Sequence, residues 1–232
     1  KKPLDLGFLD FSTIEARRLA CEEELRLNRR FSRGLYRCVV AVRGTAGDPR
    51  FEGAGEPIDH LVCMRRFPPG ALLSERLAEG TLSAELIERA AVALAGFHRR
   101  AAVARRSIAF GWPEQVLQSV LDVTRQLDGS DPRVARIRAW VQAQAWPLWD
   151  AWLERRHGGF VRECHGDLHL GNVASVGDEI VPFDCLEFSP ALRWTDVMSD
   201  VAFLAMDLEA WGRADLAFRF LDAYLASTGD FA

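Results

Sequence analysis

The sequence is short of the features that mark secreted, membrane-spanning and nucleic-acid-binding proteins. Its 232 residues include only five cysteines, with no C-x-x-C pair, which favours a reduced cytoplasm over a disulfide framework. No apolar run approaches the roughly 18 residues of a spanning helix, and no signal peptide is recognisable. The formal net charge of −4 gives no reason to expect nucleic acid or an anionic membrane as a partner. With 49% hydrophobic and 27% charged residues, we expect a cytoplasmic protein with a substantial core.

One short motif carries most of the functional information. Residues 165–172 read His-Gly-Asp-Leu-His-Leu-Gly-Asn, and Phe-Asp follows at 183–184. Extended segments enter the motif, leave it and return from a Gly-Asp turn, so a hairpin is predicted to gather Asp167, Asn172 and Asp184 around one point. Phosphoryl transfer from Mg-ATP needs one carboxylate to accept the hydroxyl proton, and an amide oxygen plus a second carboxylate to hold the metal. Magnesium prefers such hard oxygen ligands.

The same residues resemble the catalytic string H-G-D-x-x-x-x-N, with a following hydrophobic-Asp pair, of the aminoglycoside phosphotransferase family. The resemblance implies an α+β, protein-kinase-like fold of two lobes. It also implies transfer of the ATP γ-phosphoryl group to a hydroxyl of an aminoglycoside, sugar or amino alcohol. By this resemblance Asp167 is the catalytic base, His165 belongs to the same catalytic string, and Asn172 and Asp184 are the Mg²⁺ ligands. The residues after Asp184 depart from the Asp-Phe-Gly of protein kinases.

Longer segments resemble one branch of this family, uncharacterised bacterial proteins that often carry a P-loop ATP-binding domain after the kinase region. These segments are residues 2–3, 7–13, 24–30, 183–188 and 200–204. No P-loop is present in the chain, so we expect such a domain beyond Ala232. No glycine-rich phosphate loop precedes the first helix, and the chain starts at Lys1 without a methionine. We therefore expect part of a longer protein, with a truncated small β lobe.

Residues 1–67 are expected to form this partial nucleotide-binding lobe. A capping box at residues 12–15, with the serine as the cap, opens a helix that runs to about residue 30. On it Glu24 faces inward, whereas Glu22 and Glu23 point away and are read as solvated charges. Kinase-like folds need an inward glutamate to hold a strand lysine at the ATP phosphates. Lys1 and Lys2 lie just before the helix, and we assign that role to Lys1.

Two strands are predicted in the same lobe, at residues 37–43 and 60–67, with a Gly/Pro/Asp-rich loop at 44–57 between them. The second strand ends where a two-lobed kinase has its hinge. Met64 and Phe67 there suit either contact with the adenine of ATP or plain core packing, and the sequence leaves both readings open.

Residues 68–232 are expected to form a mainly helical large lobe that carries the catalytic hairpin. The predicted helices span about 83–100, 113–127, 134–152, 195–211 and 214–226. His98 is expected to be structural, and Asp200 to support the backbone of the catalytic loop. Pro147 is expected to kink the third helix. Four tryptophans crowd that helix, and we expect them to pack between helices rather than form a substrate platform: Trp140, Trp146, Trp149 and Trp152.

Two other functional classes fit parts of the pattern. A nucleotide-binding regulator without transferase activity would keep the metal residues, although it would not need a catalytic base at Asp167. A metallohydrolase could use the alternating His165, Asp167 and His169 together with Asp184 as metal ligands. Acids that suit a cationic substrate are also present at Glu187, Asp207 and Glu209, but such residues are usually solvated surface.

Overall fold

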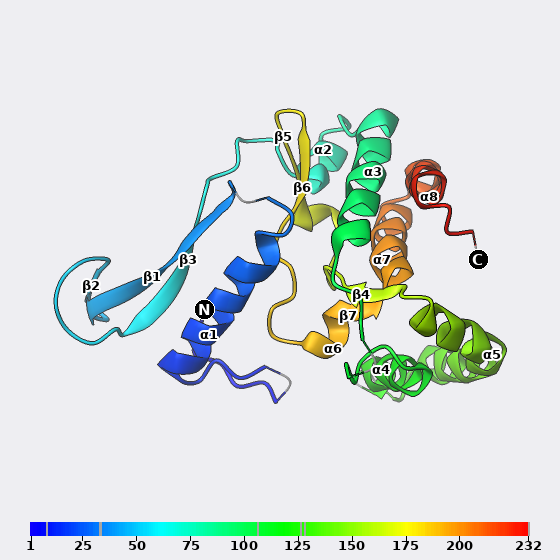
Figure 1. The fold of residues 1–232 in the computed structure, drawn as a ribbon, viewed down its shortest axis with the longest axis horizontal. Helices are drawn as coiled ribbons and strands as arrows, with labels where there is room; N and C mark the ends of the chain where they lie inside the picture. The colour runs from blue at the N-terminus through cyan, green and yellow to red at the C-terminus, as the bar shows by residue number, and fades with distance from the viewer. Residues whose placement is uncertain (8, 33, 106, 126, 128, 232) are drawn as a thin grey trace.

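The chain folds into two lobes of unequal size (Figure 1). The structure, a computed structural model, describes residues 1–7, 9–32, 34–105, 107–125, 127 and 129–231. The small lobe holds the blue helix and the cyan strands, and the large lobe holds the green-to-red helices (Figure 1). The expected lobe boundary at residue 67 falls in the segment between the last strand of the small lobe and the next helix. No helix in the described ranges combines the length and apolar character needed to cross a membrane.

The small lobe consists of one helix and a three-stranded antiparallel sheet of order β2-β1-β3. Its elements are α1 (Ile14–Asn28), β1 (Tyr36–Thr45), β2 (Asp48–Arg50) and β3 (Asp59–Met64). β1 carries the valine-rich run Val39-Val40-Ala41-Val42, and β-branched valines favour a strand. β3 pairs with it, with Cys38 opposite Cys63. The predicted helix and two strands are therefore confirmed.

Several details of this lobe differ from the sequence predictions. Thr13, not Ser12, caps α1, because the Thr13 side chain accepts a hydrogen bond from the Ala16 amide. The expected loop at 44–57 includes the short strand β2, which extends the β1 hairpin. Lys1 does not lie in a strand, and the described residues before α1 make only one isolated bridge, between Asp5 and Asp10.

The large lobe is mainly helical, and short strands lie on either side of the motif at residues 165–172. Its helices are α2 (Leu73–Ala78), α3 (Ala84–Arg100), α4 (Pro113–Arg125), α5 (Pro132–His157), α6 (Pro190–Arg193), α7 (Val197–Ala210) and α8 (Ala214–Thr228). The strands β4 (Val161–Glu163) and β7 (Trp194–Asp196) pair antiparallel, as do β5 (Val173–Val176) and β6 (Glu179–Pro182). A single 3₁₀ turn, η1 (Leu170–Asn172), precedes β5.

The core of the large lobe lies between α3, α7 and α8, which stand side by side in Figure 1. Ile87, Leu94, Leu204, Leu208 and Phe220 are each no more than 1% exposed. Burying such a side chain contributes about 1.5–3 kcal/mol relative to leaving it exposed. Leu168, Leu170 and Val173 belong to the same core, so the motif segment is anchored on these helices.

The tryptophan-rich helix α5 is less buried than its composition suggests. Trp140 and Trp146 are 64% and 80% exposed, so the expectation that they pack between helices is wrong for these two residues. The apolar spacing sets which side chains share a face, but only the neighbouring elements decide whether that face is covered. The helix also continues through Pro147 without interruption.

Candidate active site

The β5–β6 hairpin brings the three motif residues together. Val173 pairs with Pro182, and the Phe183 amide donates to the Asn172 carbonyl at 2.9 Å, so Asn172 and Asp184 lie at the same open end of the hairpin. The Asn172 side-chain amide donates to the Asp167 carbonyl at 3.0 Å and approaches the Asp167 carboxylate at 3.4 Å. Because the Asn172 Nδ2 donates to Asp167, the Oδ1 of the same amide points away from Asp167 and can serve as a ligand.

Asp184 has an unusual backbone conformation, and it is the only non-glycine among the described residues with a positive φ, +59°. Such strain is uncommon outside glycine and gathers at functional sites. The Tyr36 hydroxyl, from β1 of the small lobe, accepts a hydrogen bond from the Asp184 amide at 3.1 Å. The Asp184 residue is exposed, so its carboxylate is accessible to a ligand.

His165 is fully buried and holds the catalytic loop against the strand that leads to Asp184. Its Nε2 lies 2.8 Å from the Phe183 carbonyl, and its Nδ1 accepts from the Asp167 amide at 3.3 Å. This pattern requires the proton on Nε2. Burial lowers the pKa of His165, which keeps the ring neutral. Because both ring nitrogens form hydrogen bonds, His165 cannot serve as a metal ligand. The metallohydrolase hypothesis therefore lacks the first of its expected histidine ligands.

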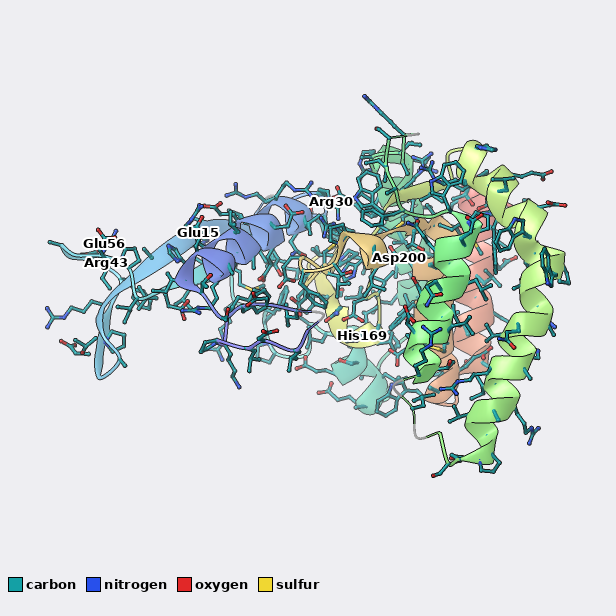
Figure 2. All side chains as sticks on the ribbon, turned by 90° about the horizontal axis from the view of Figure 1, so that it is seen from below. Glu15, Arg30, Arg43, Glu56, His169 and Asp200 are labelled. Carbon is teal, nitrogen blue, oxygen red and sulfur yellow. The ribbon has the colours of Figure 1, made fainter. Side chains whose placement is uncertain are left out.

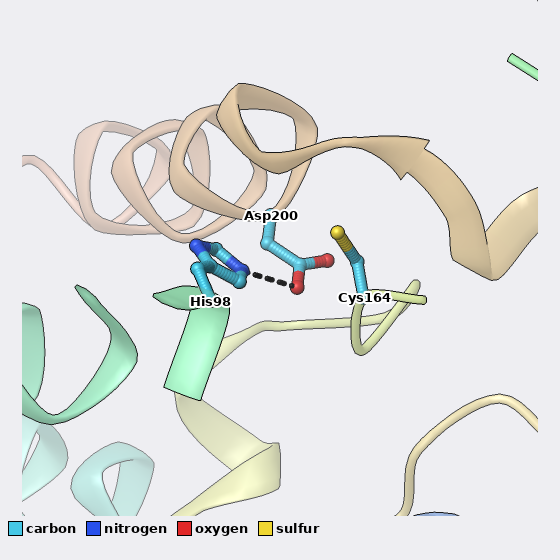
Figure 3. Close-up of side chains that lie close together, drawn as sticks. All are labelled: His98, Cys164 and Asp200. Atoms are coloured by element: carbon cyan, nitrogen blue, oxygen red, sulfur yellow. Dashed lines mark hydrogen bonds and ion pairs between the residues drawn. The ribbon is translucent and has the colours of Figure 1, made fainter. Parts of the chain in front are cut away.

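Asp200, at the start of α7, binds the backbone of the catalytic loop as expected. Its carboxylate accepts from the His165 amide at 2.7 Å and from the Gly166 amide at 2.9 Å. The Nε2 of His98 lies 3.2 Å from the same carboxylate (Figure 3). Burial alone would raise the pKa of Asp200, but the hydrogen bond from His98 and the backbone donors hold it below its ordinary value. Asp200 is therefore a buried, ionised support of the loop.

The same cluster fixes His98 and Cys164. The Nδ1 of His98 lies 2.7 Å from the Tyr224 hydroxyl, so His98 joins α3 to α8 and has the structural position predicted for it. Cys164 lies beside Asp200 (Figure 3). Burial raises the pKa of the Cys164 thiol well above its ordinary value, which disfavours the thiolate that a metal would need. We read this trio as a hydrogen-bonded support and not as a metal site.

Lys1 and Glu24 form the ion pair that the sequence suggested. Lys1 Nζ lies 2.6 Å from the Glu24 carboxylate and 2.5 Å from that of Glu187, three residues after Asp184. Burial alone would lower the pKa of Lys1, but Glu187 and Glu24 raise it to about 12. Burial raises the pKa of Glu24, and Lys1 opposes that effect. Lys1 is thus a permanent cation tied to the segment that bears Asp184.

Sequence reasoning missed how closely α1 is fastened to the catalytic region. The Asn28 Oδ1 accepts from the Cys185 amide at 3.0 Å, directly after Asp184. Arg30 donates to the Glu163 carbonyl at 2.6 Å and to the Cys164 carbonyl at 3.1 Å. Figure 2 shows Arg30 at the end of α1 that faces the large lobe. The i, i+4 spacing of Glu24 and Asn28 was a signal for one shared face, although it named no partner.

A buried carboxylate, Glu163 on β4, joins three arginines from both lobes. It lies 2.6 Å from Arg26, 3.2 Å from Arg30 and 3.3 Å from Arg193. Burial alone would raise the pKa of Glu163, but these arginines lower it. Arg193 also donates to the Glu23 carboxylate at 2.6 Å, so the interpretation of Glu23 as a solvated charge is wrong.

The remaining candidates have varied surroundings. Phe67 packs against Phe183, with ring centroids 4.7 Å apart, and both Met64 and Phe67 border the small core around Tyr36. Asp207, an acid considered for a cationic substrate, instead accepts from the Leu170 amide at 2.8 Å. His169 Nε2 lies 3.8 Å from the Asp167 carboxylate.

Comparison with known proteins identifies the family of this chain. The family model described as "Phosphotransferase enzyme family" (APH) matches residues 9–232. The chain belongs to this family. The two lobes and the catalytic hairpin described above accordingly have the protein-kinase-like architecture expected from the sequence.

Similar proteins include the "Uncharacterized protein Rv2004c" of Mycobacterium tuberculosis and the "Uncharacterized protein Mb2027c" of Mycobacterium bovis. Each is 32% identical over 245 residues, covering 100% of this chain and 46% of the relative. The chain therefore spans about half the length of these relatives. Among solved structures, a glucosamine kinase (crystal form B) has a TM-score of 0.49 at 19% identity, covering 90% of this chain and 57% of the other.

Proposed function

We propose that the chain is the kinase part of an ATP-dependent phosphotransferase whose acceptor is a hydroxyl group of a polar small molecule. The main support is the convergence of Asp167, Asn172 and Asp184 at the open end of the β5–β6 hairpin. The family membership of residues 9–232 supports the same class of reaction. The cytoplasmic location and the additional P-loop domain stay predictions.

Asp167 has the surroundings that a general base needs. It is half-buried, its carboxylate faces no arginine or lysine among the described contacts, and the Asn172 amide fixes its orientation. In the proposed reaction the acceptor oxygen bonds to the γ-phosphorus while the bond to the β–γ bridging oxygen breaks, and ADP leaves. Asp167 takes the hydroxyl proton as this occurs. His165, by contrast, is buried, so we assign it to positioning Asp167.

Asn172 and Asp184 fit the donor set of a Mg²⁺ site. An amide oxygen and an exposed carboxylate are hard oxygen ligands, and a Mg²⁺ site needs few of them because the ion keeps several waters. When bound, Mg²⁺ would neutralise charge on the phosphates. The strained backbone of Asp184 and its bond to Tyr36 would hold the carboxylate in place for this role.

Lys1, Glu24, Met64 and Phe67 complete the proposed nucleotide site. Lys1, steadied by Glu24 and Glu187, carries the charge for the ATP phosphates. Met64 and Phe67 lie where the chain leaves β3 for the large lobe, and in this proposal they contact adenine there. An idle nucleotide-binding module would share these features, so turnover is the measurement that separates the two functions.

The test compares the wild-type chain with Asp167→Asn in ADP formation, using a library of alcohols, sugars and aminoglycosides. We expect transfer to fall by about 10²–10⁴-fold, the usual contribution of a general base, with ATP affinity nearly unchanged. Asp222→Asn, an exposed aspartate on α8, is the matched control. Retention of more than a tenth of wild-type turnover in Asp167→Asn would overturn the assignment. ATP binding without transfer to any acceptor would favour the idle module.

A further inference from the structure

Two cysteines lie directly opposite each other in the small lobe. In the antiparallel pairing of β1 with β3, Cys38 of β1 is the register partner of Cys63 of β3. Side chains directly opposite in such a pair point to the same face of the sheet, with Cβ atoms about 4.5–5.5 Å apart. A disulfide needs Cβ atoms about 3.5–4.5 Å apart and Cα atoms about 4.4–6.8 Å apart. A bond between the two sulfurs therefore needs only a small adjustment of the paired strands.

The cysteine pair lies on the outer face of the sheet. Val62 and Met64 pack on the small core around Tyr36. They flank Cys63 in β3, so Cys63 points away from that core, because side chains alternate along a strand. Cys63 is half-buried and Cys38 is exposed. A small disulfide in solution can therefore reach this pair.

The other three cysteines have different surroundings. Cys21, Cys164 and Cys185 are buried, and each thiol donates to a backbone carbonyl. Burial raises the pKa of all three thiols, that of Cys185 to about 12. Because the thiolate is the nucleophile in disulfide exchange, these buried thiols react slowly. Of the five cysteines, all of which lie in the described part of the chain, only Cys38 and Cys63 combine access to solvent with a cysteine as strand partner.

We propose that Cys38 and Cys63 form a reversible disulfide by exchange with a small disulfide such as glutathione disulfide. The Cys38 thiolate attacks one sulfur of glutathione disulfide, the S–S bond breaks, and one glutathione thiolate leaves. The Cys63 thiolate then attacks the Cys38 sulfur of the mixed disulfide and displaces the second glutathione. The two protons of the protein thiols end on the two glutathione thiols. The protein thus loses two electrons, which reduce glutathione disulfide, and excess reduced glutathione reverses both steps.

The bond joins two strands close to the segment that bears Asp184. Tyr36, in the same strand as Cys38, accepts a hydrogen bond from the Asp184 amide, and β3 ends one residue after Cys63. A bond between residues 38 and 63 also restricts the unfolded chain, which stabilises the folded state. Disulfides of this transient kind are typical of redox-sensing sites in reducing compartments. We therefore expect oxidation to stabilise the fold, whatever the outcome for the proposed transferase activity.

The first experiment equilibrates the folded wild-type chain with mixtures of reduced and oxidised glutathione, blocks the free thiols and digests the protein with trypsin. We expect the peptides 38–43 and 51–65 to be joined by a disulfide, and excess reduced glutathione to separate them. In denaturing urea the equilibrium constant for this disulfide should fall at least about tenfold, because only the folded strands hold the thiols together. An equal constant in urea, or mixed disulfides with glutathione in place of the bond, would overturn the inference.

The second experiment removes one thiol at a time. Cys63→Ser should accumulate the mixed disulfide of glutathione at Cys38, because no second thiol displaces the glutathione. A mixture of unlabelled and ¹⁵N-labelled wild-type chains then shows whether the bond forms within one chain. Joined peptides should carry the same label, and pairs of unlike label at the statistical frequency would overturn the inference.

The stability of the oxidised chain provides a further test. The urea midpoint of unfolding should be higher for oxidised than for reduced wild type, and it should not rise on oxidation of Cys38→Ser or Cys63→Ser. Equal midpoints for oxidised and reduced wild type would overturn the stabilising role of the bond.

Discussion

At the scale of single residues, buried polar groups around Asp167 do more to shape the site than exposed ones. His165, Asp200 and Asn172 each use their hydrogen-bonding atoms on the catalytic loop or on the strand beside it. Their burial strengthens these bonds and makes them costly to break, because an unpaired polar group in the interior loses its contact with water. The loop is thus held by its neighbours and does not depend on a bound ligand for its shape.

The neutral state of His165 predicts a pH dependence of stability. Burial depresses its folded-state pKa below the ordinary value of 6.5, so the unfolded chain binds more protons as the pH falls below 6.5. Stability from this residue is therefore present above about pH 6.5 and is lost toward lower pH, by up to about 1.4 kcal/mol per pH unit. The measurement is the free energy of unfolding in urea at several values between pH 5.5 and 7.5.

The variant His165→Gln isolates this effect, since its side-chain amide can still donate to the Phe183 carbonyl. We expect a flatter dependence of unfolding free energy on pH in this variant, whatever its absolute stability. His157→Gln, at an exposed position, is the control. An identical slope in wild type and His165→Gln would show that another group is responsible.

Asp184 and Asn172 are predicted to respond differently to replacement. Asp184→Ala should raise the Mg²⁺ concentration needed for half-maximal ATP binding, because it removes a charged ligand. Asn172→Ala should do so less, because an amide contributes less than a carboxylate. Titration of ATP binding against Mg²⁺ in both variants measures this. An unchanged Mg²⁺ requirement in both would mean that the hairpin does not hold the metal.

At the scale of elements, α1 acts as the connection between the small lobe and the catalytic region. One face of the helix meets Lys1 and Cys185, and its C-terminal arginines reach β4. The carboxylate of Glu163 is only 6% exposed, and it lies within 3.3 Å of three guanidinium groups. This makes Glu163 the centre of the contact between the two lobes.

Glu163→Gln should therefore be strongly destabilising. Removing one partner of a buried ionic network costs about 3–5 kcal/mol. Here the arginines lose their most buried counter-charge, although Glu23 still pairs with Arg26 and Arg193. The comparison is Glu88→Gln, whose partner Arg219 lies 2.9 Å away at an exposed position and which should cost less than about 1 kcal/mol. Urea denaturation measures both. A loss in Glu163→Gln no larger than that in Glu88→Gln would contradict the prediction.

At the scale of the whole molecule, the two lobes are joined by several separate contacts across the catalytic region. Tyr36 binds the Asp184 amide, Asn28 binds the Cys185 amide, and Lys1 binds Glu187. Each contact links small-lobe residues to the segment that bears Asp184. We therefore expect the lobes to unfold in one cooperative transition, because loss of one lobe would expose the buried polar groups of the other.

This prediction can be checked with two probes. All seven tryptophans lie between residues 112 and 211 and report on the large lobe. Cys38, the exposed cysteine of β1, can carry a fluorophore that reports on the small lobe, with Cys63→Ser to prevent labelling of its neighbour. Coincident denaturation curves are expected. Two separated midpoints would show that the lobes unfold independently.

The parts of this protein that depend on local order could be predicted from the sequence. The motif residues lie within twenty positions of one another and are joined by a Gly-Asp turn, so strand pairing alone brings Asn172 and Asp184 to the same end of a hairpin. The main helices of both lobes follow from apolar spacing, and Asp200 could be assigned to the catalytic loop because a carboxylate near a buried face needs a partner.

Contacts between residues far apart in the chain could not be predicted, because they depend on how the elements pack. The sequence around Glu163 does not indicate that three arginines bind it. The sequence around Glu187 does not indicate an ion pair with Lys1, which lies 186 positions away. The exposure of Trp146 likewise depends on how the helices pack. The physical reason is that periodicity fixes the direction of a side chain on its own element. Whether that direction ends at solvent, at a counter-charge or at a cavity is set by elements that are remote in the chain.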